Sequence, residues 1–483
     1  MQKYAEIAYA LGCKYALATL KTELLPHQQR VLDRIQTQPG LVVAHGLGSG
    51  KTLTSIAAGL NEPGTTTALV PASLQENYQK EILKHVRGAK DSGIDVRSMQ
   101  LAALRGEIPK SDLLIVDEAH RAREQSAKIR NTIAHANAAR RLLLTASPVY
   151  NRPSDIAPLV NLAAGENLLP TRGDFNKKYV QEATRGWGAL MPWATKEESL
   201  KNTTSLKKIL RQWVDYHPSI GTDFPDRIDT RVSIPMTKRQ TQLHDYAWGK
   251  LPVVSRMRLK AGLPASKKDL ARLNAFQSQA RQIATSENPF STERKPIDSP
   301  KIMKAFELFQ QQAAANPRHK AVMYSNFLGN LGDYKALLDR ANIPHGVVTG
   351  EQGLDERANL VDAYNQDKLK ALLVSSAGGE GLDLKGTRQV QVMEPHWNEE
   401  KLKQVIGRAI RHGSHAHLPA DERSVDVQKF ESHPQSSIGR RALSAIGLMD
   451  KTPVGVEQIL YNLADKKEHL NSELLGLLKD PAQ

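Results

Sequence analysis

The sequence has little cysteine, few aromatic residues, fewer acidic than basic side chains and no long apolar run. Cys13 is the single cysteine, which excludes an intrachain disulfide and a thiolate-bound zinc finger. No stretch approaches the roughly 18 consecutive apolar residues that a membrane span requires. Lys14 interrupts the apolar run at 7–17, which therefore predicts an amphipathic surface helix rather than a secretory signal. We expect an intracellular, cytoplasmic protein without a membrane anchor.

The 483 residues suffice for about three domains, and 40% apolar with 24% charged residues is an ordinary globular balance. Lys and Arg outnumber Asp and Glu by 66 to 51, which gives a net charge of +15. Residues 201–350 hold 24 basic and 12 acidic side chains and so carry +12 of that charge. This surplus suits a polyanionic partner, although a solvated basic surface would have the same composition. Aromatic residues, at 5%, do not indicate extensive base-stacking platforms.

Short apolar runs alternate with helical patterns in two parts of the chain, which predicts two α/β lobes with parallel sheets. Between these parts, residues 151–300 read as helices joined by loops that contain proline and glycine. We predict a first lobe at 1–160, a helical basic middle region at 161–298, a second lobe at 299–430 and a helical tail at 431–483. The strands are predicted at 41–45, 66–70, 112–117 and 141–145 in the first lobe, and at 320–325, 344–349, 371–376 and 389–394 in the second.

A glycine loop follows the first predicted strand, in the sequence His45-Gly46-Leu47-Gly48-Ser49-Gly50-Lys51-Thr52. A strand, a glycine loop and a helix in this order are typical of a phosphate-binding loop. Glycines let backbone N–H groups turn toward phosphates, and the helix N-terminus adds positive potential. Lys51 would reach the β- and γ-phosphates of ATP, and the Thr52 hydroxyl would bind Mg²⁺. The loop residues predicted to hold the nucleotide with them are Gly46, Gly48, Ser49 and Gly50.

Two carboxylates, Asp117 and Glu118, end the strand predicted at 112–117. Asp117 can hold the Mg²⁺ shell, and Glu118 can orient and polarise the attacking water. Such a pair at a strand end is usually an exposed turn, but in the same lobe as a phosphate loop it indicates an ATPase. Upstream, Gln28 could read adenine through its amide, whereas taken singly it is better interpreted as a surface glutamine.

The second lobe contains a strand that ends in a glycine-rich loop at 375–384, followed by a helix that includes residues 404–411. The loop lacks the Lys-Thr pair of a phosphate loop, so it is not a second ATP cradle. Gln404, Arg408 and Arg411 fall on one helix face at i, i+4 and i+7. Two arginines presented together suit the stabilisation of γ-phosphate charge across a cleft. An ordinary basic helix is the alternative, but the glutamine and Gly407 on the same face favour the functional interpretation.

In this order the motifs resemble those of superfamily 2 helicases and translocases. Residues 394–398 before Gln404, and 411–415 after it, are similar to the Swi/Snf-like branch. The similarity is greatest to its small phage and viral members, including poxvirus-type nucleic-acid-dependent ATPases. The resemblance covers roughly residues 25–415. It implies two RecA-like lobes that close on ATP and Mg²⁺ at their interface and move along nucleic acid.

The resemblance also implies roles for individual residues. Lys51, Thr52, Asp117 and Glu118 correspond to the nucleotide chemistry, and Arg408 and Arg411, on the helix with Gln404, to arginine fingers. Gly381 and Asp383 fall within the second-lobe motif that adjoins the nucleotide. The positions that couple hydrolysis to lobe movement are His120, Thr145 and Ser147.

Contacts to the nucleic-acid backbone are expected from both lobes and from the middle region. The resemblance implies them for Ser73 and Ser375. The middle region has a run of basic residues between Arg256 and Arg281 that is interrupted by one acid, Asp269. This run could be a solvated helical face or a surface that tracks phosphates. Its candidate contacts are Arg256, Arg258 and Lys260.

We therefore expect a monomeric, ATP- and Mg²⁺-dependent motor that moves along DNA, with duplex DNA as the preferred substrate. Phosphate contacts position a protein without specifying bases, so tracking should be independent of sequence. The alternatives are a strand-separating or branch-migrating helicase, an ATPase directed to RNA or to a transcription complex, and a non-catalytic scaffold. Lys51, Glu118 and Arg408 argue against the scaffold. Expected partners are duplex, forked or branched DNA and replication, recombination or transcription proteins, in the bacterial host cytoplasm if the protein is phage-encoded.

Overall fold

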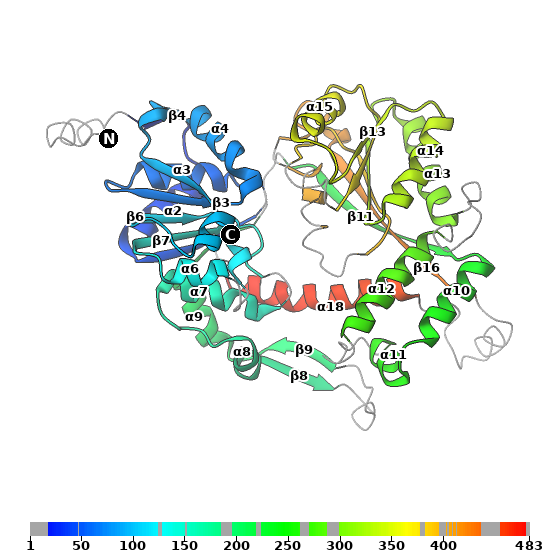
Figure 1. Ribbon diagram of the computed structural model, residues 1–483, viewed down its shortest axis with the longest axis horizontal. Helices are drawn as coiled ribbons and strands as arrows, with labels where there is room; N and C mark the ends of the chain where they lie inside the picture. Colours follow the sequence, from blue (N-terminus) through cyan, green and yellow to red (C-terminus); the bar gives the residue numbers. More distant parts are fainter. Residues whose placement is uncertain are drawn as a thin grey trace. The chain divides into compact units, whose positions relative to one another are not determined.

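The computed structural model (Figure 1) describes residues 18–46, 48–123, 128–149, 152–184, 196–218, 224–260, 270–286, 299–376, 382–395, 402, 405–407, 409–411, 413–435 and 455–479. By its internal contacts the chain divides into two units. The first comprises Met1–Ala183, Glu198–Ile220 and Lys467–Gln483, and the second Thr184–Glu197 and Gly221–Lys466. Each unit contains one six-stranded parallel sheet with helices on both faces. This confirms the predicted fold class of two RecA-like lobes.

The first unit has the strand order β10-β2-β7-β6-β3-β5, and every neighbouring pair is parallel. Leu41 and Val43 of β2 pack with α2, α3 and α4 on one face, whereas Val42 and Ala44 pack with α7 and α9 on the other. Because both faces are buried, the central strands read as continuous apolar runs. The strands are β10 (Val214–His217), β2 (Gly40–His45), β7 (Ala138–Thr145), β6 (Ser111–Val116), β3 (Thr66–Val70) and β5 (Ile94–Ser98).

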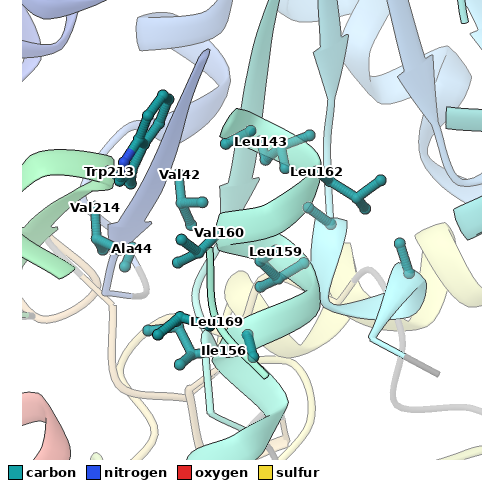
Figure 2. Close-up of a cluster of buried hydrophobic side chains, with 14 of the residues drawn as sticks. Val42, Ala44, Leu143, Ile156, Leu159, Val160, Leu162, Leu169, Trp213 and Val214 are labelled. Atoms are coloured by element: carbon teal, nitrogen blue, oxygen red, sulfur yellow. The ribbon is translucent and has the colours of Figure 1, made fainter. Parts of the chain in front are cut away.

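Figure 2 shows the cluster on the second of these faces. Val42 of β2 and Leu143 of β7 face the apolar side of α7, which contributes Leu159, Val160 and Leu162. Trp213, at the end of α9, belongs to the same cluster. This packing holds β10 beside β2, although β10 lies within the predicted middle region.

The helices of the first unit are α2 (Pro26–Thr37), α3 (Lys51–Leu60), α4 (Gln75–His85), α5 (Met99–Arg105), α6 (Lys128–Ala134), α7 (Ile156–Ala164), α8 (Arg172–Tyr179) and α9 (Thr203–Trp213). Two small two-stranded sheets pair β1 (Thr19–Leu20) with β4 (Val86–Arg87), and β8 (Val180–Thr184) with β9 (Lys196–Leu200). No helix in the described part of the chain is long and apolar enough to cross a membrane.

The second unit has the strand order β11-β16-β15-β12-β14-β13, again parallel throughout. Tyr324 of β12 packs on one face, and Met323 packs with α13 and α14 on the other. The strands are β11 (Asp226–Pro235), β16 (Ser424–His433), β15 (Gln389–Val392), β12 (Ala321–Ser325), β14 (Ala371–Ser375) and β13 (His345–Val348). The helices are α10 (Lys238–Gly249), α11 (Val253–Lys260), α12 (Leu270–Thr285), α13 (Pro300–Ala315), α14 (Leu328–Arg340) and α15 (Leu354–Asn365).

The middle region predicted at 161–298 is divided between the two units, with α8 and α9 in the first and α10 to α12 in the second. Helix α18 (Val456–Gly476), in the predicted tail, contributes residues up to Lys466 to the second unit and the rest to the first. The four-part division at 1–160, 161–298, 299–430 and 431–483 stays a prediction.

Candidate functional site

The glycine loop connects the end of β2 to the start of α3 in the first unit. Gly48 and Gly50 have φ of 77° and 75°, a left-handed conformation that glycine adopts without steric cost. A Cβ placed on Gly50 would lie 2.4 Å from Nε2 of Gln28. The loop therefore has the backbone of a phosphate cradle, and a side chain at position 50 would require the Gln28 amide to move.

Two consecutive side chains of α2 hold the far end of this loop. Gln28, which is 2% exposed, accepts a hydrogen bond from the Leu25 N–H and donates from Nε2 to the Ser49 carbonyl over 3.2 Å. His27 Nε2 lies 2.9 Å from the same carbonyl. Gln28 is thus buried against the loop and not a surface glutamine. His27 is not among the predicted site residues, and its place beside Gln28 is the one signal for it in the sequence.

Lys51 lies over the start of the loop, where its ammonium donates to the carbonyls of His45 (2.9 Å) and Gly46 (2.8 Å). The Ser49 hydroxyl also donates to the Gly46 carbonyl, over 2.8 Å. These carbonyls keep the lysine at the loop, where incoming phosphate oxygens could replace them as partners.

Asp117 follows β6 at the carboxyl edge of the same sheet, where ligands of parallel α/β folds bind. Its N–H donates to the Leu69 carbonyl, and its Oδ1 accepts the Glu118 N–H over 2.9 Å. Burial, together with the charge of Glu118, raises the pKa of Asp117 to about 6, and the charge of Lys51 opposes this rise. Asp117 is therefore a buried carboxylate within electrostatic reach of the loop lysine.

Glu118 is one of the few non-glycine residues with a left-handed backbone, at φ 50°. This conformation costs roughly 1–2 kcal/mol, and such strain is concentrated at functional sites. Burial alone would raise the pKa of Glu118, but the hydrogen bond with His120 and the charge of Lys51 bring it below its ordinary value. Glu118 is thus ionised at neutral pH and can accept a proton.

His120 connects Glu118 to the end of the neighbouring strand, β7. Its Nδ1 lies 3.1 Å from Oε2 of Glu118 and 3.3 Å from the hydroxyl of Thr145. The Thr145 hydroxyl in turn accepts the N–H of Ser147 over 3.0 Å. The three residues predicted to couple hydrolysis to movement are therefore brought together, in contact with Glu118.

Thr52 and Asp117 have donor atoms that fit a magnesium ion. Thr52 is in the first turn of α3, and hydroxyl and carboxylate oxygens are the hard ligands that Mg²⁺ prefers. A cation would also favour the ionised form of the buried Asp117. Among the described residues, no group of three or more His, Cys, Asp and Glu side chains is arranged to hold a metal. Mg²⁺ at this position would accordingly take most of its ligands from phosphates and water.

The second-unit candidates are only partly described. Arg411 donates from Nη1 to Oδ1 of Asp383 over 3.2 Å, with side chains that are 29% and 53% exposed. Two predicted nucleotide-site residues therefore pair with each other. Ser375 ends β14 and is buried. The predicted residues Gly381, Gln404 and Arg408 lie outside the described residues.

The first-unit and middle-region candidates for nucleic-acid contact differ in exposure. Ser73 is exposed in the short helix η1 (Ala72–Leu74), directly after β3. Arg256 is half-buried on α11. The side chains of Arg258 and Lys260 lie outside the described ones.

Glu394 forms a buried polar centre in the second unit that the sequence analysis assigned only to a motif. Its carboxylate accepts hydrogen bonds from the Ser325 hydroxyl (2.9 Å), the Asn326 N–H (3.0 Å) and the Asn330 amide (2.6 Å). Burial raises the pKa of Glu394. Glu394 thus ties the chain after β15 to the end of β12, a contact that no local pattern in the sequence indicated.

The glycine loop, the carboxylate pair and the two parallel sheets define a nucleotide-hydrolysing enzyme of two α/β lobes. Two family descriptions match the chain, the SNF2-related domain over residues 99–289 and the helicase conserved C-terminal domain over residues 301–413. The chain belongs to the Swi/Snf-like branch of the superfamily 2 helicases, and it is a nucleic-acid-dependent ATPase.

Relatives from viruses and animals are similar to this chain in sequence. Protein L538 of Acanthamoeba polyphaga mimivirus, described as an ATP-dependent RNA helicase, is 32% identical over 84% of this chain and 88% of its own length. The termination factor NPH-I homolog of African swine fever virus is 23% identical over 92% of this chain and 76% of its own length. The RAD54-like DNA repair and recombination protein of Drosophila mojavensis is 24% identical over 77% of this chain and 56% of its own length. The Sulfolobus solfataricus SWI2/SNF2 ATPase core in complex with dsDNA aligns over 95% of this chain and 98% of that one, with 17% identity and a TM-score of 0.36.

Proposed function

We propose that this protein is an ATP- and Mg²⁺-dependent motor that moves along double-stranded DNA. The observation that carries the proposal is the arrangement at the carboxyl edge of the first sheet. There the glycine loop, Lys51 and the Asp117-Glu118 pair lie within electrostatic reach of one another. The choice of DNA is supported by the RAD54-like relative, whose name refers to DNA repair and recombination, and by the net charge of +15.

Each residue of the first unit has a distinct task in this proposal. Lys51 exchanges the His45 and Gly46 carbonyls for phosphate oxygens. Thr52 and Asp117 hold Mg²⁺, which would neutralise charge on the phosphates. Glu118, ionised at neutral pH, orients the attacking water and accepts its proton. When that proton arrives, the Glu118–His120 contact changes, and the Thr145 hydroxyl and Ser147 N–H transmit the change along the end of β7.

Residues of the second unit also have roles in this proposal. Gln404, Arg408 and Arg411 would stabilise charge on the γ-phosphate, and Gly381 and Asp383 would adjoin the nucleotide. The proposed contacts to the phosphate backbone are Ser73, Ser375, Arg256, Arg258 and Lys260. The protein would act as a monomer on duplex, forked or branched DNA, together with replication, recombination or transcription proteins.

The experiment that tests this function compares steady-state ATPase rates with duplex DNA, single strands, forks, four-way junctions and RNA at one salt concentration. Strong stimulation by plain duplex is the expected result. A rate that rises only with forks or junctions would replace translocation by strand separation or branch migration. The absence of stimulation by any DNA would contradict the proposal.

A second candidate function is an ATPase directed to RNA or to a transcription complex. It is favoured by the mimivirus relative, described as an RNA helicase, and by the African swine fever virus relative, described as a termination factor. In the same experiment, stimulation by RNA above that by duplex DNA would select this function.

A further inference from the structure

Strand β10 contacts the nucleotide loop although it belongs to none of the ATP motifs. The Gly46 N–H donates to the His217 carbonyl over 2.8 Å, and His45 Nε2 lies 2.8 Å from Oδ1 of Asp215. The His217 ring also stacks on the His27 ring with centroids 3.9 Å apart, and His27 holds the Ser49 carbonyl. Thus β10 reaches the start of the loop directly and its far end through His27.

Asp215 is the centre of these contacts. Its side chain is 0% exposed, and Arg30 binds it in a bidentate manner, from Nε (2.9 Å) and Nη2 (2.8 Å). Arg34 donates from Nη1 over 3.0 Å. Burial would raise the pKa of Asp215, but the hydrogen bonds from His45 and Arg30 hold it well below its ordinary value. A buried, ionised aspartate therefore joins α2, the end of β2 and β10.

The link from Asp215 to His45 fixes the first residue of the loop. An ionised carboxylate can only accept hydrogen bonds, so the proton of His45 is on Nε2. Burial lowers the pKa of His45, so the ring is neutral, and its buried Nδ1 has no hydrogen-bond partner among the described residues. Asp215 is thus the one described hydrogen-bond partner of this ring, which also lies edge-on to the rings of His27 and His217. The carbonyl of His45 is also an acceptor for the Lys51 ammonium, so the orientation of this residue bears on where the lysine rests.

We propose that Asp215 is a positioning residue for the nucleotide: acting through His45, and held by Arg30 and Arg34, it keeps the glycine loop in the conformation that binds ATP. The inference rests on the proposed ATP site and adds to it a determinant outside every sequence motif of that site. Its effect falls on ATP affinity, because Asp215 touches the loop and not the carboxylates that carry out hydrolysis.

The test compares Asp215→Asn with wild type and with Asp112→Asn in the full chain. Asp112 also accepts hydrogen bonds in the first unit, from the N–H and hydroxyl of Thr65, but it is the second residue of β6 (Ser111–Val116), at the end of the strand away from Asp117 and Glu118. Asp215→Asn leaves two guanidinium groups facing an uncharged amide and so populates loop conformations that do not bind ATP. If about one molecule in ten remains competent, the dissociation constant of a fluorescent ATP analogue and the KM for ATP both rise about tenfold. We expect kcat at saturating ATP to stay within about twofold, and Asp112→Asn to shift thermal stability without shifting KM.

A second variant, His45→Ala, removes the link and leaves the Arg30–Asp215 pair intact. It should raise KM as Asp215→Asn does, and the double variant should add little to KM, because both substitutions disrupt the same contact between residues 45 and 215. If Asp215→Asn does not fold, the KM for ATP and the thermal stability of His45→Ala are compared with those of Asp112→Asn instead. An unchanged KM in both variants, with stability lowered as in Asp112→Asn, would overturn the positioning role. Lys51→Ala tests the ATP site separately. That variant should lose ATP turnover whether or not Asp215 positions the loop, so a failure of the Asp215 proposal can be told apart from a failure of the proposed ATP site.

Discussion

The raised pKa of Asp117 predicts that ATP binding with Mg²⁺ weakens in mild acid. Burial and the neighbouring charge of Glu118 set this pKa to about 6, so a proton competes with the cation for the carboxylate near that pH. Above pH 6 the Asp117 carboxylate is ionised and free to hold Mg²⁺. Below pH 6 its proton must be released before the cation can bind, so binding weakens as the pH falls.

The magnitude follows from one titrating group. The apparent dissociation constant scales with 1 + 10^(pKa − pH), so with a pKa of about 6 binding is roughly tenfold weaker at pH 5 than at pH 7. This is about 1.4 kcal/mol. Glu118 does not add to the effect in this range, because its pKa lies below its ordinary value.

The assay measures binding of Mg²⁺ with a non-hydrolysable ATP analogue to the wild-type protein by calorimetry, because Glu118→Gln would remove the charge that helps to raise the Asp117 pKa. The control is Asp117→Asn, which lacks the titrating group and should bind weakly with little dependence on pH. Calorimetry in buffers of different ionisation enthalpy should also show the release of about half a proton at pH 6 in the wild type. A dissociation constant that is flat between pH 5 and pH 7, or a pH dependence that persists in Asp117→Asn, would contradict this prediction.

Three further predictions concern the loop and the nucleic acid. Lys51→Ala should abolish ATP turnover and leave DNA binding intact, as measured by ATPase and filter-binding assays. Gly50→Ala should weaken ATP binding, because its Cβ would lie 2.4 Å from Gln28 Nε2 and would displace the amide that donates to the Ser49 carbonyl, whereas Gly106→Ala has a similar φ of +76° with open space around it. Gly106→Ala is the control, and it should lose about 1–2 kcal/mol of stability while its KM for ATP stays unchanged. Charge reversal at Arg256, Arg258 and Lys260 should weaken DNA binding and flatten its salt dependence. Unaltered DNA affinity would show that this basic run is a solvated helical face.

The buried strands could be predicted because their physical setting leaves a mark on the local sequence. All eight predicted strands are present, with ends displaced by a few residues, as in the prediction at 389–394 for β15 (Gln389–Val392). Strands β5, β10 and β11 were missed because each is at an edge of its sheet and carries polar residues. Strand β16, which lies between β11 and β15, contains both buried and half-buried residues and includes Asp426 and Lys429, so it lacks an apolar run.

The local parts of the site could also be predicted, whereas the supporting contacts could not. Lys51 and Glu118 belong to short motifs whose spacing reports the chemistry. Asp215 is 170 positions from His45 in sequence, and nothing near it shows that β10 pairs with β2. The same holds for Glu394, whose partners come from the end of β12 and from the chain after it. Such contacts depend on the order of strands in the sheet, which the sequence pattern alone does not specify.

Displacement of the third strand from a DNA triplex measures most directly whether this ATP site drives movement along duplex DNA. We predict that the wild-type protein, given ATP and Mg²⁺ and loaded on the duplex arm, releases the third strand, and that Glu118→Gln binds the same DNA without releasing it. A wild-type protein that hydrolyses ATP on duplex DNA but leaves the triplex intact, or a Glu118→Gln variant that releases the strand equally well, would contradict it.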